Sequence, residues 1–573
     1  MRKVMLASLS VVALMVAGSA QGQVKSWFEF KNPNPTIRED PLMPGPDLAS
    51  APVLNGPGGL AIGFEGISQF QAASFGRGFI PPDTMGAVGT TQYVQLINGG
   101  FGVYSKATGA ALVVKSDNDF WTAAGGTATN GDPRVMFNAS TNRWVALGFG
   151  GTVNGGIPNI QIAVSDTDDA LGGWKSTTFT GYNPFNLFRP IADYPTMAMD
   201  ANALYIGTNN FAGSTAQGVQ SFRGTTLNVI PLSSLFDAGG PSATGLKQFE
   251  NFFNTPGQTN SFAGFAIQGV NSSEASTTGN IFTTSATDYA VQRYDILNTG
   301  TAGASMTAVQ TLANGSYTGL CGGTNCAGRQ PGQAGTGSAA AGLRNIDTLD
   351  DRISSSVFEV NGRIYAVQTV MKAGNDHTQV RYYVIDSATN AVLDQGEIGD
   401  NTYDYYQGSL AVNDQGKVVI SYNRSGGIAT GTDGRISIFA QAFETKSNGK
   451  LVAKGNALLL KQSLTGGYLN GNTEASGSPA GRQRWGDYSS TTLDPLDNNL
   501  FWVIGEFARE ANTPANGYPS GTGFSRWGTY IAALSYGELA GIPEPQSWIM
   551  MLFGFGLVGA MLRRKQGLEQ VAA

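Results

Sequence analysis

The stretch Asp132-Pro-Arg-Val-Met-Phe-Asn-Ala-Ser-Thr-Asn-Arg-Trp-Val-Ala-Leu-Gly-Phe149 carries the pattern that decides the fold. It has a polar lead with an aspartate, a short run, an Asn-containing turn, and a second run with aromatic and β-branched residues. Alternation along each run places one face of a strand inward, and the turn residues tolerate the positive φ of a tight connection. The stretch therefore predicts a β-hairpin.

The same pattern recurs along the chain. Six copies occur, at Asp83–Asn98, Asp132–Phe149, Asp193–Asn209, Asp351–Gln368, Gly408–Tyr422 and Asp487–Val503. Consecutive copies begin about 50 to 80 residues apart, except for a gap of about 158 between the third and the fourth. A four-stranded propeller blade with generous loops needs about this spacing. The long gap has room for one more blade, and 262–268 and 290–296 supply candidate strands for it.

The fold class predicted from these repeats is all-β, a β-propeller for which seven blades are favoured over six. The final strand, Trp527–Ala533, is expected to close the ring by pairing with Gly63–Ser68, because closure removes exposed sheet edges. A string of separate β-sandwich domains is the alternative. It is disfavoured because no linker-like stretch interrupts residues 83–536.

The composition fits an extracellular all-β protein. Charged residues make up 13% of the chain, which contains 78 glycines, and the formal net charge is −6. A surface of this kind relies on neutral hydrogen-bonding groups and tight turns. Because no basic block occurs outside the two ends, nucleic acid is not expected as a partner.

The N-terminus has the features of a secretory signal peptide at residues 1–20. Arg2-Lys3 form a positive region, Val4–Val16 an apolar region, and Gly18-Ser19-Ala20 a small-residue cleavage site. Cleavage is expected after Ala20, with cleavage after Gly22 as the alternative. A Pro-rich segment at 21–62 follows, then the propeller body at 63–537.

The C-terminal segment at 538–573 has the features of a membrane anchor. Its marked residues are Pro543, Glu544 and Pro545, an apolar run from Trp548 to Leu562, and the cluster Arg563, Arg564 and Lys565. About fifteen apolar residues give a helix of roughly 22 Å, shorter than the ~30 Å hydrocarbon core. Snorkelling arginines and local thinning of the bilayer can close the difference. A buried C-terminal helix is the alternative, which the proline-flanked start and the basic end disfavour.

The residues Pro543–Trp548, Met550–Met551, Gly554–Gly556 and Arg563–Lys565 resemble the PEP-CTERM sorting signal of Gram-negative bacteria. The resemblance implies handling by an exosortase, a membrane protease, and a single transmembrane helix in the inner membrane. It also implies a final place in the cell envelope, at the surface or in the exopolysaccharide matrix. The same tail is also labelled an ice-binding protein C-terminal domain. That label refers to a sorting signal and does not imply ice binding. Gln566–Ala573 extend beyond the point where many relatives end.

The body resembles secreted bacterial propellers with sialidase-like blades. The residues that carry this resemblance are Pro82–Thr84 with Val88–Gly89, Gly131–Val135 with Asn142–Trp144, Asp347–Arg352, and Arg484–Ser490. The resemblance implies a fold and no particular activity.

Cys321 and Cys326 are the only cysteines, and in an exported chain they predict a disulfide. The loop between them is short, so its stabilising effect is modest and local. They lie in a Gly-rich stretch at 313–343, which is expected to be a surface insertion. A metal site would need two further ligands from a chain with one histidine.

That histidine, His377, lies in the polar run Gly374–Gln379 and is expected to be a solvent-exposed turn residue. A single histidine leaves little room for a His-based triad or a zinc site. No nucleophile elbow, phosphate loop or dinucleotide fingerprint occurs, so no cofactor is expected. The Asp-rich turns at Asp166–Asp169 and Asp494–Asn499 could hold calcium or be ordinary capped turns, and no metal ligand is assigned.

The enzyme hypothesis with the strongest basis is glycoside hydrolysis, because sialidase-type propellers use arginines, carboxylates and a tyrosine without histidine. The candidate residues are Arg134, Arg189, Arg352 and Arg484, each near the start of a blade. The favoured alternative is that they brace neighbouring blades by pairing with Asp132, Asp193, Asp351 and Asp487. The sequence leaves enzymatic activity open and favours its absence.

The sequence thus predicts an exported binding or structural propeller that is sorted to the envelope, with polysaccharide as a possible ligand class. A sialidase-like carbohydrate-active hydrolase is the alternative. Five aromatic residues could stack on sugar faces or pack inside blades: Trp144, Tyr403, Tyr405, Tyr406 and Trp485.

Overall fold

The computed structural model describes most of the body and neither end of the chain. The described residues are 53–54, 59–129, 131–153, 157–182, 191–214, 219–252, 264–285, 290–313, 328–331, 345–349, 351–371, 377–468, 483–511 and 525–540. They are mainly β-strands, so the predicted all-β class is confirmed. The predicted signal peptide, the C-terminal segment 541–573, Cys321, Cys326 and Arg189 lie outside the described residues.

The strands form antiparallel groups in chain order. The first group contains β3 (Gly86–Val88), β4 (Gln92–Ile97), β5 (Gly100–Ser105) and β6 (Ala111–Lys115). The second contains β7 (Arg134–Asn138), β8 (Arg143–Val153), β9 (Ile157–Ser165) and β10 (Trp174–Phe179). The third contains β11 (Ile191–Asp193), β12 (Ala198–Met199), β13 (Ala203–Ser214), β14 (Val219–Pro231) and β15 (Lys247–Phe252).

Two further groups share one nine-stranded sheet. One contains β16 (Gly264–Ser272), β17 (Thr278–Ser285), β18 (Val291–Leu297), β19 (Ser305–Met306) and β20 (Gln310–Ala313). The other contains β21 (Val357–Val360), β22 (Arg363–Met371), β23 (Thr378–Asp386) and β24 (Val392–Ile398). A short parallel pairing of β16 with β21 joins them.

The last two groups complete the body. One contains β25 (Tyr403–Val412), β26 (Lys417–Gly426), β27 (Ser437–Thr445) and β28 (Leu451–Gln462). The other contains β29 (Ser490–Leu493), β30 (Leu500–Ala511) and β31 (Ser525–Ser535), together with β2 (Leu60–Ser68) and β1 (Val53–Leu54). The helical elements are α2 (Gln69–Ser74), α3 (Asp117–Ala123), α4 (Leu232–Leu235), η3 (Ile428–Gly434) and α6 (Tyr536–Ala540).

The predicted hairpins and the predicted closing pair are both present. In the hairpin of β7 and β8, Phe137 pairs with Trp144 across a turn in which Asn142 has φ 51°. The long gap between repeats contains β16 and β18, as its two candidate strands predicted. The pairing of 63–68 with the final strand is also confirmed, since β2 runs antiparallel to β31 with Phe64 opposite Ile531.

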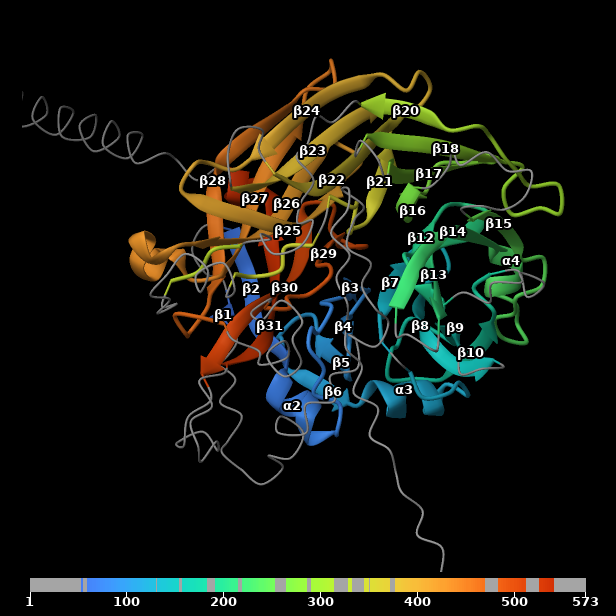
Figure 1. Cartoon of the computed structure of the whole chain (residues 1–573), viewed down its shortest axis with the longest axis horizontal. Helices are drawn as coiled ribbons and strands as arrows, with labels where there is room; N and C mark the ends of the chain where they lie inside the picture. The colour runs from blue at the N-terminus through green and yellow to red at the C-terminus, as the bar shows by residue number, and fades with distance from the viewer. Residues whose placement is uncertain are drawn as a thin grey trace, which may run out of the picture.

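The groups are arranged around a common centre, with their first strands innermost. Figure 1 shows β3, β7, β16, β21, β25 and β29 nearest the centre and β6, β10, β15, β24 and β28 toward the outside. Apolar side chains fill the space between neighbouring groups, and five tryptophans are fully buried there: Trp121, Trp144, Trp485, Trp502 and Trp527. This propeller-like arrangement buries both faces of each sheet.

The innermost strands all begin at the same end of the molecule. The segments just before them contact one another: Tyr488 donates to the carbonyl of Pro133 (2.7 Å), and Arg134 donates to that of Ser354 (3.2 Å). We call this end the loop face. Because strands alternate in direction, second strands end and third strands begin at this face, and fourth strands end there before the first strand of the next group begins.

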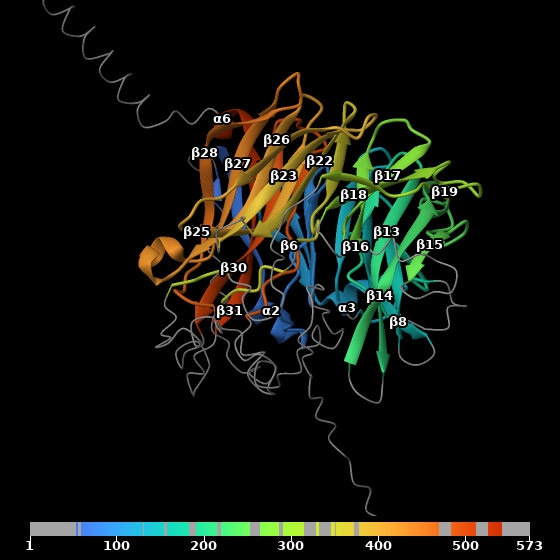
Figure 2. The same cartoon turned by 45° about the horizontal axis from the view of Figure 1, so that its top comes forward.

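The opposite end, which we call the turn face, carries the connections between first and second strands and between third and fourth strands. These are mostly short turns, and turns of neighbouring groups bond to one another. Asn413 donates to the carbonyl of Asn498 (2.6 Å), and Asn361 to that of Asp414 (2.6 Å). Figure 2, which turns the molecule by 45°, shows the strands running between the two ends.

One expectation about the stretch 313–343 is wrong for its described residues. Gly328, Gln330 and Pro331 are buried, not part of a surface insertion. Gln330 donates to the carbonyl of Tyr468 (2.9 Å) and accepts from its N–H (2.6 Å). These reciprocal bonds satisfy a buried amide, which explains why a polar residue is held inside.

Among the described residues, no helix combines the length and the apolar character needed to cross a bilayer. The candidate membrane segment falls outside that set.

Candidate functional site

Several residues inside or just before the innermost strands share an unusual backbone conformation. Asp83 (φ 50°), Asp132 (φ 51°), Tyr194 (φ 52°) and Gln407 (φ 55°) are left-handed, although none is glycine. Short polar side chains such as Asp tolerate this conformation because they bond to nearby backbone groups. The Asp-containing leads at Asp83 and Asp132 therefore mark the point where the chain bends into β3 and β7.

Aspartate carboxylates at these bends accept hydrogen bonds from neighbouring groups. Asp83 accepts from the side chain of Asn98 (2.8 Å) and from the backbone N–H of Asp487 (2.8 Å). Asp132 accepts from the N–H of Tyr194 (3.1 Å). The bonds from Asp487 and Tyr194 each join one strand group to another, so the two aspartates link strand groups at the centre of the loop face.

Arginines complete the same cluster. Arg134 is 2% exposed; its Nε donates to the carbonyl of Pro195 (3.1 Å), and its guanidinium lies 3.4 Å from the ring centre of Tyr488. Arg352, also 2% exposed, lies 4.3 Å from the ring centre of Tyr194. Arg484 pairs with Asp487 (3.1 Å) and lies 3.9 Å from Asp347.

These contacts bear on the two hypotheses for the arginines, namely that they form a catalytic site or that they brace neighbouring blades. The predicted pairing of Arg484 with Asp487 is confirmed. Arg134 does not pair with Asp132 as expected; it binds backbone carbonyls and an aromatic ring instead. Both arginines are buried between strand groups, which agrees with a bracing role.

Burial also sets the ionisation of the central carboxyls. The pKa of Asp83 is raised well above its ordinary value by burial and by the neighbouring carboxylates of Asp487 and Asp132. Burial likewise raises the pKa of Glu506, on β30, and Asp83 and Asp487 add to the shift. Glu506 accepts from the N–H of Gly486 (2.7 Å), which opposes it. The cluster therefore holds carboxyls whose charged forms are disfavoured.

The tyrosines of the cluster are donors, not nucleophiles. Tyr488 donates its hydroxyl to the carbonyl of Pro133 (2.7 Å), and Tyr194 donates to that of Asp487 (3.3 Å). Burial raises the pKa of Tyr488 well above its ordinary value, so the phenolate needed for attack on a sugar is disfavoured. These contacts support a structural role for the central cluster.

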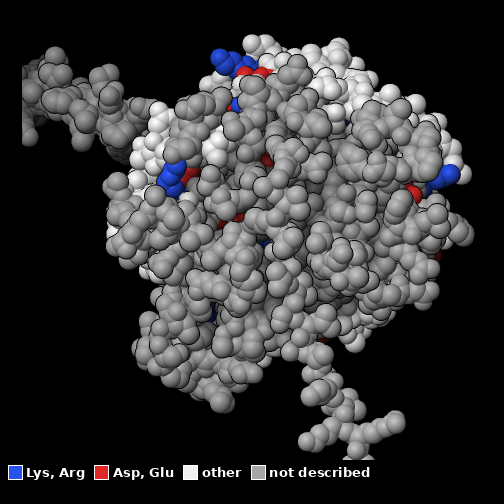
Figure 3. All heavy atoms as spheres, in the orientation of Figure 1, with Lys and Arg blue, Asp and Glu red and all other residues white. Residues whose placement is uncertain are grey.

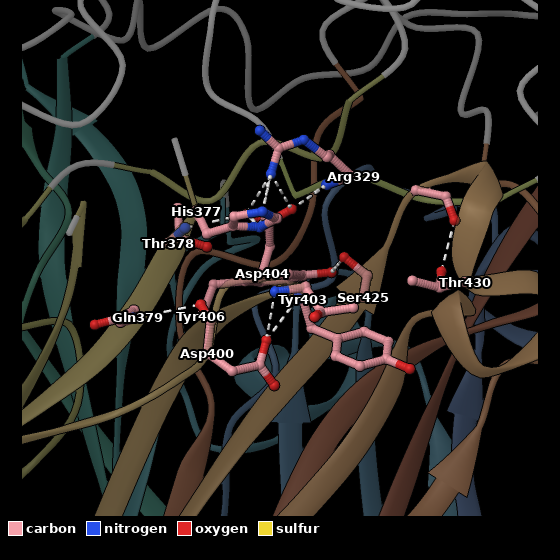
Figure 4. Close-up of polar contacts among 12 residues, drawn as sticks. Arg329, His377, Thr378, Gln379, Asp400, Tyr403, Asp404, Tyr406, Ser425 and Thr430 are labelled. Carbon is pink, nitrogen blue, oxygen red and sulfur yellow. Dashed lines mark hydrogen bonds and ion pairs between the residues drawn. The ribbon is translucent and has the colours of Figure 1, made fainter. Parts of the chain in front are cut away.

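A second polar group lies on the loop face between β23 and β25 and is partly exposed. Asp404, fully buried, accepts from the backbone N–H groups of Arg329 (2.9 Å) and Thr378 (3.0 Å). The side chains of Arg329 and His377 are 27% and 12% exposed and lie 3.4 Å and 3.3 Å from the Asp404 carboxylate. Figure 4 shows the guanidinium and the imidazole together over Asp404.

The expectation for His377 is wrong. It is not a solvent-exposed turn residue, because its side chain is only 12% exposed and lies beside the buried Asp404 carboxylate. Arg329 Nη1 lies 2.7 Å from His377 Nδ1, and since a guanidinium only donates, Nδ1 accepts in this contact. Local sequence does not indicate this contact, because Arg329 lies 48 residues from His377 and 75 from Asp404.

A cation and an aromatic ring lie at the same end of β25 and β26, on the other face of the sheet from the Asp404 side chain, because successive strand residues point to opposite faces. Arg424 on β26 is half-buried and lies 4.2 Å from the ring centre of Tyr403 and 4.3 Å from that of Phe439. We call Arg329, His377, Tyr403, Asp404 and Arg424 the Arg329 group. The other four aromatic residues considered for sugar stacking, Trp144, Tyr405, Tyr406 and Trp485, are buried in the core.

The two Asp-rich turns form capped turns. Asp494 accepts from the N–H groups of Leu496 (2.9 Å) and Asp497 (3.2 Å), and it pairs with Lys106 (2.7 Å). Asp169 accepts from the N–H of Leu171 (2.9 Å). No cluster of three or more potential metal ligands occurs within the described ranges. On the face that Figure 3 views, the largest visible patches of Lys and Arg atoms lie apart from one another near the outline, close to Asp or Glu.

Comparison with known proteins identifies the C-terminal segment. Residues 541–565 match the PEP-CTERM protein-sorting motif, so the resemblance drawn from the sequence is confirmed. No curated protein matches the chain.

Several solved structures resemble the body weakly. A Dyadobacter fermentans protein of unknown function has a TM-score of 0.36 at 11% identity, over 70% of this chain and 93% of that one. The Trypanosoma rangeli sialidase has a TM-score of 0.32 at 11% identity, over 71% of this chain and 54% of that one. The Fusarium graminearum α-L-arabinofuranosidase Arb93A has a TM-score of 0.33 at 9% identity, over 71% of this chain and 93% of that one. No functional conclusion follows from similarities this low.

Proposed function

We propose that the chain is an exported protein of a Gram-negative bacterium, sorted by an exosortase to the cell envelope or the exopolysaccharide matrix. The observation that carries this proposal is the sorting motif at residues 541–565, directly after the body. Residues 1–20 act as the signal peptide, with cleavage after Ala20. The tail tethers the protein to the inner membrane through the apolar run that starts at Trp548 and ends before Arg563.

The body acts as a seven-bladed propeller in this proposal. The hydrogen-bond pattern supports it, since seven antiparallel groups follow one another along the chain. The pairing of β2 with β31 supplies the closing strand of the last blade. A disulfide between Cys321 and Cys326 adds a local restraint.

The function proposed for this body is binding, with acidic polysaccharide as the ligand class and the Arg329 group as the binding surface. Arg329 and Arg424 supply guanidinium groups that suit planar carboxylates. Tyr403, half-buried beside Arg424, supplies an aromatic ring against which a sugar can pack. The place of these residues at strand ends on the loop face supports the same choice, because binding residues are concentrated where a rigid scaffold positions them.

The hydrolase alternative lacks support from the central cluster. A retaining or inverting glycosidase needs two carboxyl groups, or a tyrosine with a carboxyl, open to a sugar ring. Asp83, Asp487 and Glu506 are 2% exposed or less, and the tyrosines beside them donate to backbone carbonyls.

The experiment is a glycan array combined with a fluorogenic glycoside screen on the secreted body. We expect binding to uronic-acid-containing glycans and no turnover. Arg329→Gln should weaken binding by about tenfold, because one charge-assisted contact is worth about 1.4 kcal/mol. Lys450→Gln, which removes a cation from the turn face, is the matched control and should bind normally. Turnover of any glycoside would favour the hydrolase, and equal binding by both variants would exclude the Arg329 group.

A further inference from the structure

The C-terminal end of the described body leaves at the turn face. β31 runs from the loop face to the turn face and continues directly into α6, which ends at Ala540. β2 runs the opposite way, with Leu60 opposite Leu534 near the end of β31. The residue before it, Gly59, is packed so closely against α6 that an added Cβ would lie 2.6 Å from the Leu539 nitrogen.

The exit point is fixed to the body. In α6, Tyr536 is 5% exposed and Leu539 is fully buried. The Tyr536 N–H donates to the carbonyl of Asn499 (2.8 Å), and its hydroxyl donates to that of Phe443 (2.9 Å). The chain therefore leaves from a defined place on the turn face, beside β27 and β28.

The connection from this point to the apolar run is short. Seven residues, 541–547, separate Ala540 from Trp548. Fully extended, they reach at most about 25 Å. β26, which spans the body from the turn face to the loop face, has ten residues and a length of about 33 Å. A tether of this length cannot pass along the side of the body and place the loop face against the bilayer.

We propose that the turn face is the membrane-facing surface of the tethered protein and that the loop face, with the Arg329 group, points away from the bilayer. This inference rests on the proposed membrane tether. The partner of the turn face is a phospholipid headgroup surface. Polar and charged side chains near the exit, such as Asn448, Lys450 and Glu538, are exposed and suit contact with headgroups better than insertion.

The test uses the full chain, with Cys321 and Cys326 replaced by serine, in vesicles of phosphatidylcholine and phosphatidylglycerol. Gln415→Cys and Asp433→Cys place a fluorophore at exposed positions beyond opposite ends of β26. A quencher attached to lipid headgroups should act about twofold or more strongly on the Gln415→Cys label, because the sites are about 30 Å apart along the strand. Equal quenching, or stronger quenching at Asp433→Cys, would overturn the orientation.

A chain that ends at Ala540 is the control and should stay unbound. If the full chain fails to bind vesicles, the tether is refuted and the orientation with it. Equal quenching of a bound protein would refute the orientation alone, so the two outcomes can be distinguished. Lysine acetylation of the unmodified chain gives a second measurement that needs no cysteine variant. Vesicles should protect Lys450, on the turn face, and leave Lys115, at the loop-face end of β6, unchanged. The reverse pattern would overturn the proposal.

Discussion

The carboxylate of Asp83 accepts a hydrogen bond from the backbone N–H of Asp487, 404 residues later in the chain, at 2.8 Å. Asp83 precedes the first strand group and Asp487 precedes β29 of the last one. This bond joins the two ends of the repeat array at the loop face, while β2 joins them along β31. The first and last strand groups are therefore joined by a buried polar contact as well as by a shared sheet.

The buried carboxyl groups beside this contact make stability depend on pH. At pH values above 4.5, the ordinary pKa of Glu506, this carboxyl has lost its proton in the unfolded chain. In the folded protein its pKa is raised, so the proton is still bound. The free energy of unfolding therefore falls as pH rises from that value toward the raised one. Glu506→Gln keeps an acceptor for the Gly486 N–H and removes the titration, so its Tm should fall less than that of the wild type between about pH 5 and about pH 8. Parallel Tm profiles for the two proteins would contradict this assignment.

Removal of the Arg134 side chain should destabilise the body strongly. Arg134→Ala leaves the carbonyls of Pro195 and Ser354 without their donor and opens a cavity beside Tyr488. We expect a loss of about 3 kcal/mol in urea unfolding. Arg435→Ala is the control, since Arg435 makes one long bond at the surface, and it should change stability by less than about 0.5 kcal/mol. Similar losses for the two variants would show that Arg134 does not brace the centre.

The sequence predicts the fold well because its repeats are local. Each hairpin is encoded within about 18 residues, by alternation around a turn such as Asn142. The closing pair could also be predicted, because Gly63–Ser68 and Trp527–Ala533 lie at the two ends of the array. Periodicity of two and turn chemistry are properties of neighbouring residues, so a single sequence carries them.

The site could be predicted only in part, because its contacts connect distant residues. Arg134 was singled out by its position near a strand start, yet its partners are carbonyls, which every residue has. Asp404 is flanked by Tyr403 and Tyr405, and nothing local indicates that it holds Arg329 and His377. Burial of a carboxylate depends on the whole ring, and the spacing of charged residues does not report it.

The N-terminal strand is expected to be essential for a soluble body. A chain that starts at Gln69 lacks β2, so the edge of β31 and the side chains that packed against Ile62 and Phe64 become exposed. Such an edge promotes aggregation. A chain that starts at Gly59 keeps β2 and serves as the control. Size-exclusion chromatography should show a monomer for the longer chain and aggregates for the shorter one; a monomeric, cooperatively folded shorter chain would show that closure is dispensable.

Two glycines should respond in opposite directions to replacement by alanine, because one is confined and the other is not. Gly99 has φ +93°, and a Cβ there would lie 2.1 Å from the carbonyl oxygen of Arg77, so Gly99→Ala should cost more than about 2 kcal/mol. Gly537 lies in α6 with nothing within 4 Å of an added Cβ. Gly537→Ala should therefore stabilise the body by about 0.5–1 kcal/mol, since alanine is the better helix former. Urea unfolding of both variants measures the difference. A loss of stability in Gly537→Ala would mean that α6 is not docked as described, and the fixed exit of the chain at the turn face would lose its support.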